Sequence, residues 1–201
     1  MISLAKTRPL LIALIIFCFF STFNLKADSS QATVPINITV NGKLIITDAE
    51  NDTKSGTNPT LNVLLKLTPD LGSSVVSGKS AIRIRTNLNN WKLTAQRNDI
   101  SNSTNIDPEH VSLSFTTQAG SKADLYSGKL LAPFDTVTNL GQISTGVSTD
   151  VLSGTSKTSI GKDPENKNNW FQLTSNYSVE PDFFYNTGEW STVVSYSLVS
   201  P

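Results

Sequence analysis

The sequence is poor in the residues that most often carry catalysis and covalent cross-links. Among its 201 residues there is one cysteine, Cys18, and one histidine, His110. Cys18 lies in an apolar stretch near the N-terminus, so the rest of the chain has no thiol from which to form a disulfide. Stability must therefore come from a hydrophobic core. The scarcity of cysteine and histidine also excludes an ordinary zinc site.

Clusters of basic residues are absent as well. The chain has 16 lysines and arginines and 16 aspartates and glutamates, and no run of Lys or Arg. Because Lys6, Arg8 and Lys26 lie at the N-terminus, residues 28–201 carry three more acidic than basic side chains. A nucleic-acid partner is not expected, since phosphate binding needs clustered positive charge.

A short apolar run opens the chain. Lys6 and Arg8 precede the run Leu10–Phe20, and polar residues return before Ala27. This order predicts a secretory signal peptide over residues 1–27, and an uncleaved anchor is the alternative. The run is short for a membrane span, which needs about 20 apolar residues, and no later stretch is long enough. We therefore expect a protein that is secreted or held at the cell surface.

Alternation of apolar and polar residues dominates the remaining sequence. It is clearest in four segments: Ile36–Val40, Ile82–Arg85, Val111–Thr116 and Trp190–Leu198. Each predicts a strand with one buried face, and no stretch shows the spacing of an amphipathic helix. We expect an all-β fold, a single antiparallel β-sandwich of immunoglobulin-like or jelly-roll-like type, over residues 28–201.

Weaker signals complete the expected strand order. The dipeptide Asn41-Gly42 predicts a hairpin joining residues 36–40 to residues 44–46. Further strands are expected at residues 61–67, 91–95 and 170–179, with turn regions at 48–59 and 69–80. From Gly120 to Gly161 the pattern is weak, and only short strands near Leu130 and at residues 143–147 are expected.

Candidate catalytic groups are isolated from one another in the sequence. His110 lies in a predicted turn, and no nucleophile-elbow motif accompanies it. Two pairs of closely spaced acids occur in polar loops: Asp163 with Glu165, and Glu180 with Asp182. Solvated loop side chains are the simplest interpretation of both pairs. We expect a protein that is not an enzyme and that needs no cofactor.

Oxygen ligands for calcium occur at one place. Asp48, Glu50 and Asp52 alternate along the chain, and Asn58 would add a further oxygen. An EF-hand loop requires glycine at its sixth position and glutamate at its twelfth, which are Thr53 and Pro59 here. We therefore interpret these acids as a solvated loop and predict no metal site.

The aromatic residues give the candidate contact surface. Aromatic side chains at alternating strand positions, such as Trp91 and Phe115, are expected in the core. Phe183, Phe184 and Tyr185 are adjacent in a predicted turn, and three neighbours cannot all face one core. At least one of them is expected to be exposed, and an exposed aromatic residue can mark a contact surface.

Two motifs resemble the WxL-type cell-surface domains of bacteria. The first is Trp91-x-Leu93, and the second, near the C-terminus and after Trp190, is Tyr196-x-Leu198, with tyrosine where the family has tryptophan. That family consists of secreted β-rich domains that associate non-covalently with the cell wall and take part in surface complexes. The resemblance implies a non-catalytic exported module whose partners are envelope polysaccharide or other surface proteins. On alternation alone, the five motif residues are expected in the core.

The chain is also similar in composition to fimbrial subunits, which are sandwiches rich in Ser, Thr and Asn. On that interpretation Val34–Val40 is a strand donated to the open edge of a neighbour. The protein would then be an oligomer, a structural subunit of a fimbria-like or surface polymer. The Asn41-Gly42 hairpin signal favours the ordinary alternative, in which this strand pairs within its own domain.

Overall fold

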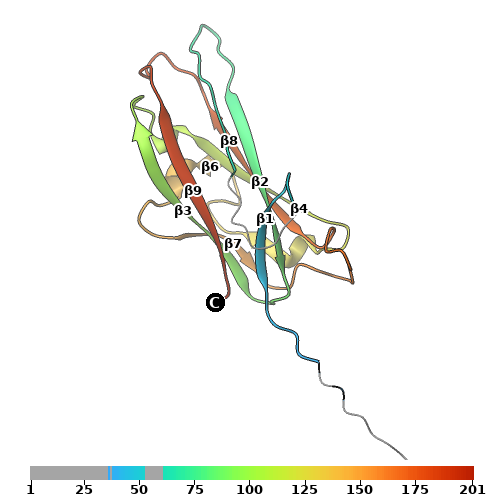
Figure 1. Ribbon diagram of the computed structural model, residues 1–201. Helices are drawn as coiled ribbons and strands as arrows, with labels where there is room; N and C mark the ends of the chain where they lie inside the picture. Colours follow the sequence, from blue (N-terminus) through green and yellow to red (C-terminus); the bar gives the residue numbers. More distant parts are fainter. Residues whose placement is uncertain (1–35, 37, 53–60) are drawn as a thin grey trace, which may run out of the picture. The chain divides into compact units, whose positions relative to one another are not determined.

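The computed structural model describes residues 36, 38–52 and 61–201 (Figure 1). The chain divides into two units, Met1–Thr39 and Val40–Pro201, and all the β-structure described below belongs to the second. Among its described residues are also three short 3-10 helices: η1 (Pro108–His110), η2 (Leu125–Ser127) and η3 (Leu140–Gln142). Within the described ranges, no helix has the length and apolar character needed to cross a membrane.

Two antiparallel sheets form the second unit. The first has the strand order β1-β2-β8-β4-β6, with bounds β1 (Leu44–Asp48), β2 (Val76–Thr86), β8 (Phe171–Val179), β4 (Ser112–Ala119) and β6 (Thr138–Asn139). The second has the order β5-β7-β3-β9, with bounds β5 (Gly128–Leu130), β7 (Thr149–Gly154), β3 (Trp91–Asn102) and β9 (Trp190–Val199).

The two sheets enclose a single core. Alternate side chains point inward, as in β2, where Ile82 and Ile84 are buried between exposed or half-buried neighbours. They meet inward-facing residues of the other sheet, such as Leu93 of β3 and Leu152 of β7, in one hydrophobic cluster. This confirms the predicted all-β antiparallel sandwich, because each strand has one apolar face that only a facing sheet can cover.

Strand register defines the two ends of the sandwich. Val76 at the start of β2 pairs with Val179 at the end of β8, and Asn102 at the end of β3 pairs with Trp190 at the start of β9. We call this the distal end, and it lies at the top of Figure 1. The opposite, proximal end holds Trp91 and Phe171. The loops that adjoin these strand ends can be assigned to the distal or the proximal end from this register.

The predicted hairpin at Asn41-Gly42 does not form. Ile36 and residues 38–43 belong to no strand, and β1 pairs with the distant β2 instead. The Asn87 side chain engages the backbone where the turn was expected: its Oδ1 accepts from the Lys43 amide at 2.7 Å, and its Nδ2 donates to the Asn41 carbonyl at 2.8 Å. The interpretation of residues 36–40 as an ordinary hairpin strand is therefore wrong for its described residues.

Segment 61–67 has the predicted alternation without the predicted strand. Leu61, Leu65 and Leu67 pack against the core, but the segment pairs with no described strand. Side chains rather than backbone hold it to β2. A Cβ at Gly78 would lie 2.7 Å from Val63 and 2.8 Å from Leu65, so the missing side chain makes this close approach possible. Alternation of apolar and polar residues indicates that one face of a segment is buried. It does not require that the backbone of the segment pairs with another strand.

Three further boundaries differ from the sequence interpretation. β2 begins at Val76, inside the expected turn region. The strand expected at residues 143–147 is absent, because Ile143 ends the η3 turn and is fully buried. β7 (Thr149–Gly154) was not predicted. The short strand expected near Leu130 is present as β5.

Candidate functional site

The first tryptophan motif lies inside the sandwich. Trp91 and Leu93 are fully buried, and the Trp91 indole Nε1 donates to the Ser156 carbonyl at 2.8 Å. The Trp91 ring meets Phe171 edge-on, with centroids 6.1 Å apart. A Cβ at Gly154 would lie only 1.9 Å from the indole, so glycine is required to seat it. These residues hold the fold and offer no surface to a partner.

The second motif lies beside the first in the same sheet. Register pairs Leu198 of β9 with Leu93 of β3, and Tyr196 with Ala95. The Tyr196 hydroxyl is within hydrogen-bond distance of Ser175 Oγ, at 3.0 Å, and burial raises the pKa of Tyr196 well above its usual range. Trp190 packs against the same core. The sequence separation of the two motifs gave no sign that they are neighbours.

The turn before β9 presents two aromatic side chains to solvent. Phe183 is 73% exposed and Phe184 is 66% exposed, whereas Tyr185 is half-buried. The Tyr185 ring lies 5.6 Å from that of His110. Burial and the nearby carboxylates of Asp182 and Glu180 raise the pKa of Tyr185. Of the three predicted contact residues, two are exposed and the third anchors the turn.

Hydrogen bonds hold this turn in one conformation. The Asp182 carboxylate accepts a hydrogen bond from the Phe184 amide at 2.7 Å, and the backbone carbonyl of Asp182 accepts one from the Tyr185 amide at 3.2 Å. Asn105, with φ of 53°, donates to the Phe184 carbonyl at 3.2 Å and accepts from the Asn186 amide at 2.9 Å. An aromatic pair that is held in place loses little entropy when it binds a partner.

Strand register brings other exposed apolar side chains to the same end. The loop before Val76 carries Leu71, which is 94% exposed, and Val75. Ile100 is exposed near the end of β3. We define the distal surface as these three residues together with Phe183 and Phe184. The sequence predicted that at least one of Phe183, Phe184 and Tyr185 is exposed, but it gave no sign of Leu71, Val75 or Ile100, because only the register places their segments together.

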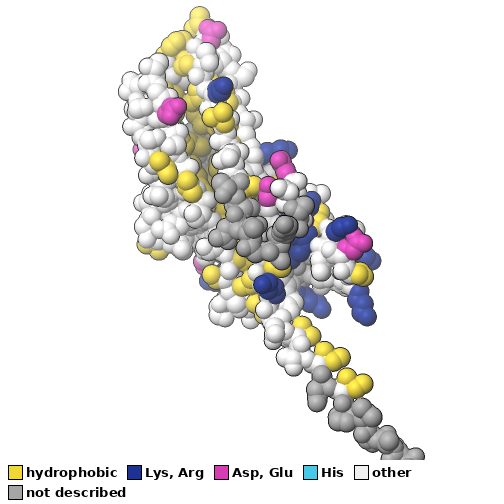
Figure 2. All heavy atoms as spheres, in the orientation of Figure 1, with side chains coloured by type: hydrophobic (Ala, Val, Ile, Leu, Met, Phe, Trp, Pro, Cys, Tyr) yellow, Lys and Arg dark blue, Asp and Glu magenta, His cyan; other side chains and the backbone are white. Residues whose placement is uncertain are grey.

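The distal loops carry charge of one sign. Residues 68–75, 103–110 and 180–189 contain six acidic residues and no lysine or arginine. The six are Asp70, Asp107, Glu109, Glu180, Asp182 and Glu189, and all are exposed. None of them forms an ion pair with any residue that the structure describes. In Figure 2 the upper tip shows hydrophobic and acidic side chains, while lysines and arginines gather toward the lower right.

No family model matches the chain, and no curated protein matches it significantly. Any functional statement therefore rests on the molecule itself.

The isolated titratable groups make local contacts within their own loops. His110 Nδ1 accepts from the Asp107 amide at 3.2 Å and so closes the cap of η1. Asp163 accepts from the Asn168 amide at 2.6 Å, and Glu165 pairs with Lys167. Each of these groups has a local structural partner, as expected for loop side chains.

Asp52 differs from the solvated loop residue that the sequence predicted. Its carboxylate accepts from Arg85 at 2.6 Å, Arg83 at 2.9 Å and the Thr47 hydroxyl at 2.6 Å. Burial alone would raise the pKa of Asp52, but the hydrogen bonds from Arg85, Thr47 and Arg83 outweigh it and hold the pKa at about 2. The Arg83 guanidinium also lies 4.1 Å from the Trp170 ring centroid.

This cluster engages Asp52, one of the three alternating acids. Asp52 is committed to two arginines, and Asp48 accepts from the Glu50 amide at 2.9 Å. Asn58 lies outside the described residues. No group of three or more metal-ligating His, Cys, Asp or Glu side chains occurs in the part of the chain that the structure describes.

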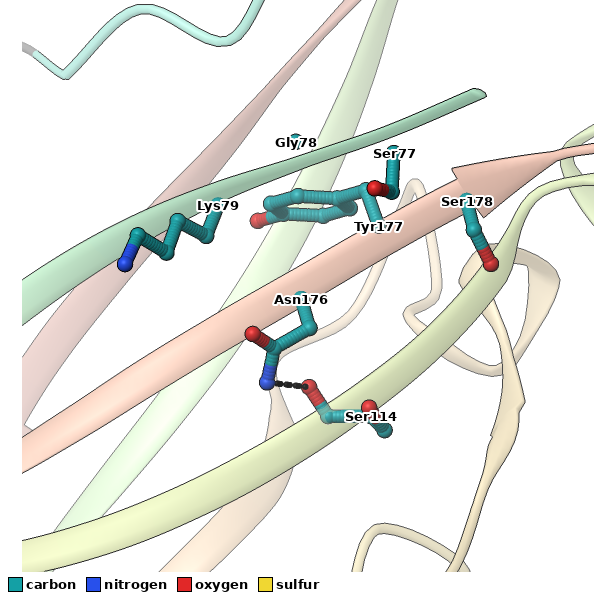
Figure 3. A pocket seen from close by; sticks show the side chains of 7 residues that line it. All are labelled: Ser77, Gly78, Lys79, Ser114, Asn176, Tyr177 and Ser178. Carbon is teal, nitrogen blue, oxygen red and sulfur yellow. Dashed lines mark hydrogen bonds between the residues drawn. The ribbon is translucent and has the colours of Figure 1, made fainter. Parts of the chain in front are cut away.

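A shallow depression lies on the outer face of the larger sheet (Figure 3). It has a volume of about 420 Å³ and is lined by Ser77, Gly78, Lys79, Ser114, Asn176, Tyr177 and Ser178. Asn176 donates to the Ser114 carbonyl at 3.4 Å across its floor. Its lining of hydroxyl and amide groups includes one charged side chain, Lys79, and brings no base beside a serine. The distal surface is the stronger candidate.

Proposed function

We propose that the protein is a non-catalytic, exported cell-surface module that acts by docking its distal surface onto envelope polysaccharide or proteins of surface complexes. Export rests on the signal-peptide pattern of residues 1–27. The docking role rests on one observation above all: Phe183 and Phe184 are exposed on a turn that hydrogen bonds hold in place. Folding gives no reason to expose two adjacent aromatic rings, whereas binding does.

The resemblance to WxL-type domains supports the surface role of the protein, but it does not identify the residues that make the contact. In this chain Trp91, Leu93 and Leu198 belong to the core cluster or pack against it. The tryptophan motifs would therefore mark the fold of such domains, and the contact with the envelope would be made elsewhere. The distal surface supplies exposed aromatic rings, which stack well on the apolar faces of sugars and also dominate protein interfaces.

The test is co-sedimentation of the exported protein with isolated cell walls. The contact variant is Phe183→Ser with Phe184→Ser, and the matched control is Val193→Ser with Val199→Ser, which removes two exposed apolar side chains of β9. We expect the contact variant to lose at least about tenfold in binding, since aromatic anchors dominate such contacts, and the control to bind as the wild type does. Equal binding by both variants would refute the role of the distal surface.

A second candidate function is a structural subunit that polymerises by strand addition. β9 is the edge of its sheet, and its ten residues include no charge, proline or glycine. Natural edge strands are normally protected by such residues, so this edge is suited to pairing with another strand. The predicted donor Val34–Val40 lies partly outside the described residues, and its described apolar residues Ile36, Ile38 and Val40 are exposed.

The second function predicts that polymer formation depends on β9 and on residues 28–40 rather than on the distal surface. Val193→Lys places a charge on β9 without touching the distal surface, and should abolish polymers that form by strand addition. Removal of residues 28–40 should have the same effect. Polymers that persist in both variants would exclude strand addition at this edge.

A further inference from the structure

The two ends of the sandwich both expose apolar side chains but differ in the charge of their loops. The distal surface has exposed apolar side chains beside six acids of the distal loops, none of which forms an ion pair with a described residue. At the proximal end, Leu125, Tyr126 and Ile160 are exposed, and Tyr126 is 85% exposed. Lys122, Lys157 and Lys162 lie in the same two loops and form no ion pair with a described residue. We name these six residues the proximal surface.

Backbone contacts join the two segments of the proximal surface. Ala123 and Ser159 form an isolated antiparallel bridge, and the Asp124 amide donates to the Thr158 carbonyl at 2.9 Å. The Ile160 amide donates to the Lys122 carbonyl at 3.1 Å. The lysines and the exposed apolar side chains are therefore presented by one bridged pair of segments.

The proximal loops, residues 120–127 and 155–170, hold four lysines and three acids, whereas the distal loops hold six acids and no lysine or arginine. Asp124 caps η2 by accepting from the Tyr126 amide at 2.8 Å, and Asp163 accepts from the Asn168 amide. Glu165 pairs with Lys167. The distal loops themselves contain no lysine or arginine, and Lys66 and Lys79 precede and follow the loop of residues 68–75. The distal loops are therefore strongly acidic and the proximal loops slightly basic, and both ends expose apolar side chains.

We propose that the partner docked on the distal surface is the proximal surface of a second copy of this chain. The inference rests on the proposed function only in taking the distal surface as the contact surface. Because the two surfaces differ and lie at opposite ends, the contact is head-to-tail, and such a contact does not close on itself after two copies. Copies would therefore add in line, with Phe183 and Phe184 against Tyr126 and Ile160 and the acids facing the lysines.

The experiment is sedimentation velocity of the exported protein and two blocked variants at low ionic strength. The distal-blocked variant is Phe183→Ser with Phe184→Ser. The proximal-blocked variant is Tyr126→Ser with Lys122→Glu and Lys162→Glu. Lys66→Glu with Lys79→Glu is the charge control. Circular dichroism establishes that each variant is folded, which is expected because every substituted side chain is exposed.

The wild type and charge control should form a ladder of oligomers that grows with concentration and weakens as salt rises. Each blocked variant alone should remain monomeric to at least about tenfold higher concentration. An equal mixture of the two blocked variants should form a dimer and nothing larger, because one supplies an intact proximal surface and the other an intact distal surface.

A monomeric wild type at its highest soluble concentration, a mixture that stays monomeric, or a blocked variant that still forms the ladder would each overturn the inference. Co-sedimentation with cell walls separates this failure from that of the proposed function. A monomeric wild type that binds walls through Phe183 and Phe184 keeps the function and loses the inference. A mixture that forms the dimer, in a protein that does not bind walls, would keep the inference and refute the proposed function.

Discussion

The core of the proximal half and the loops of the distal end use the same residue types in opposite ways. At the proximal end the aromatic residues Trp91 and Phe171 are buried against each other, and Asp52 in that half is held by two arginines. At the distal end Phe183 and Phe184 are exposed, and six acids have no cationic partner among the described residues. The comparison shows that partners and burial, rather than residue type, separate a group that stabilises the fold from one whose side chain is left exposed to solvent.

The largest expected effect is at Trp91. Trp91→Ala should lower the free energy of unfolding by about 3–5 kcal/mol, because it leaves a large cavity beside Phe171 and removes the partner of the Ser156 carbonyl. Urea unfolding followed by circular dichroism measures the loss. A loss below about 1 kcal/mol, the range of an exposed residue, would contradict the contrast between the proximal core and the distal loops.

The next effect is at Asp52. Asp52→Asn leaves Arg83 and Arg85 without their carboxylate and should lower the free energy of unfolding by about 1–3 kcal/mol. The matched control is Asp150→Asn, which breaks the more exposed pair with Lys92 and should cost less than about 1 kcal/mol. Equal losses in the two variants would show that the Asp52 cluster is no more than a surface pair.

The same carboxylate predicts a pH dependence. The pKa of Asp52 is about 2 in the folded protein against 3.8 as its ordinary value, so its pairing stabilises the fold fully above about pH 4. This contribution, about 1–2 kcal/mol, should be lost as the pH falls from about 4 to 2. Comparison of urea unfolding in wild type and Asp52→Asn across this range isolates it, and parallel curves would contradict the assignment.

The smallest expected effect on stability is at the distal turn. Phe183→Ser with Phe184→Ser should change the free energy of unfolding by no more than about 0.5 kcal/mol, because neither ring is buried. The hydrogen bonds of the turn use backbone groups that the substitutions keep. A loss of several kcal/mol would mean that the pair supports the fold rather than a contact.

Sequence periodicity predicted the sandwich because alternation directly reports which face of a strand is buried. It located the strands that include Ile82, Phe115 and Tyr196. It failed at residues 36–40, where a local turn signal was outweighed by the distant pairing of β1 with β2. It also failed at residues 61–67, where side chains pack on Gly78 without strand pairing.

The candidate site was predictable only in its most local part. Three adjacent aromatic residues in a turn predicted that at least one of Phe183, Phe184 and Tyr185 is exposed, and the structure exposes the first two. Leu71 and Ile100 join them through the register of strands far apart in sequence, which no local pattern encodes. Asp52 looked solvated because its arginines lie more than 30 residues away, on the neighbouring strand β2.

The measurement that tests the central claim most directly is a pair of values, unfolding free energy and cell-wall binding, for the distal double variant and for Trp91→Phe. The distal variant should keep its stability within about 0.5 kcal/mol and lose at least about tenfold in binding. Trp91→Phe should lose stability, through the missing indole hydrogen bond, and bind walls as the wild type does while folded. Wall binding that follows Trp91 instead of Phe183 and Phe184 would contradict the account.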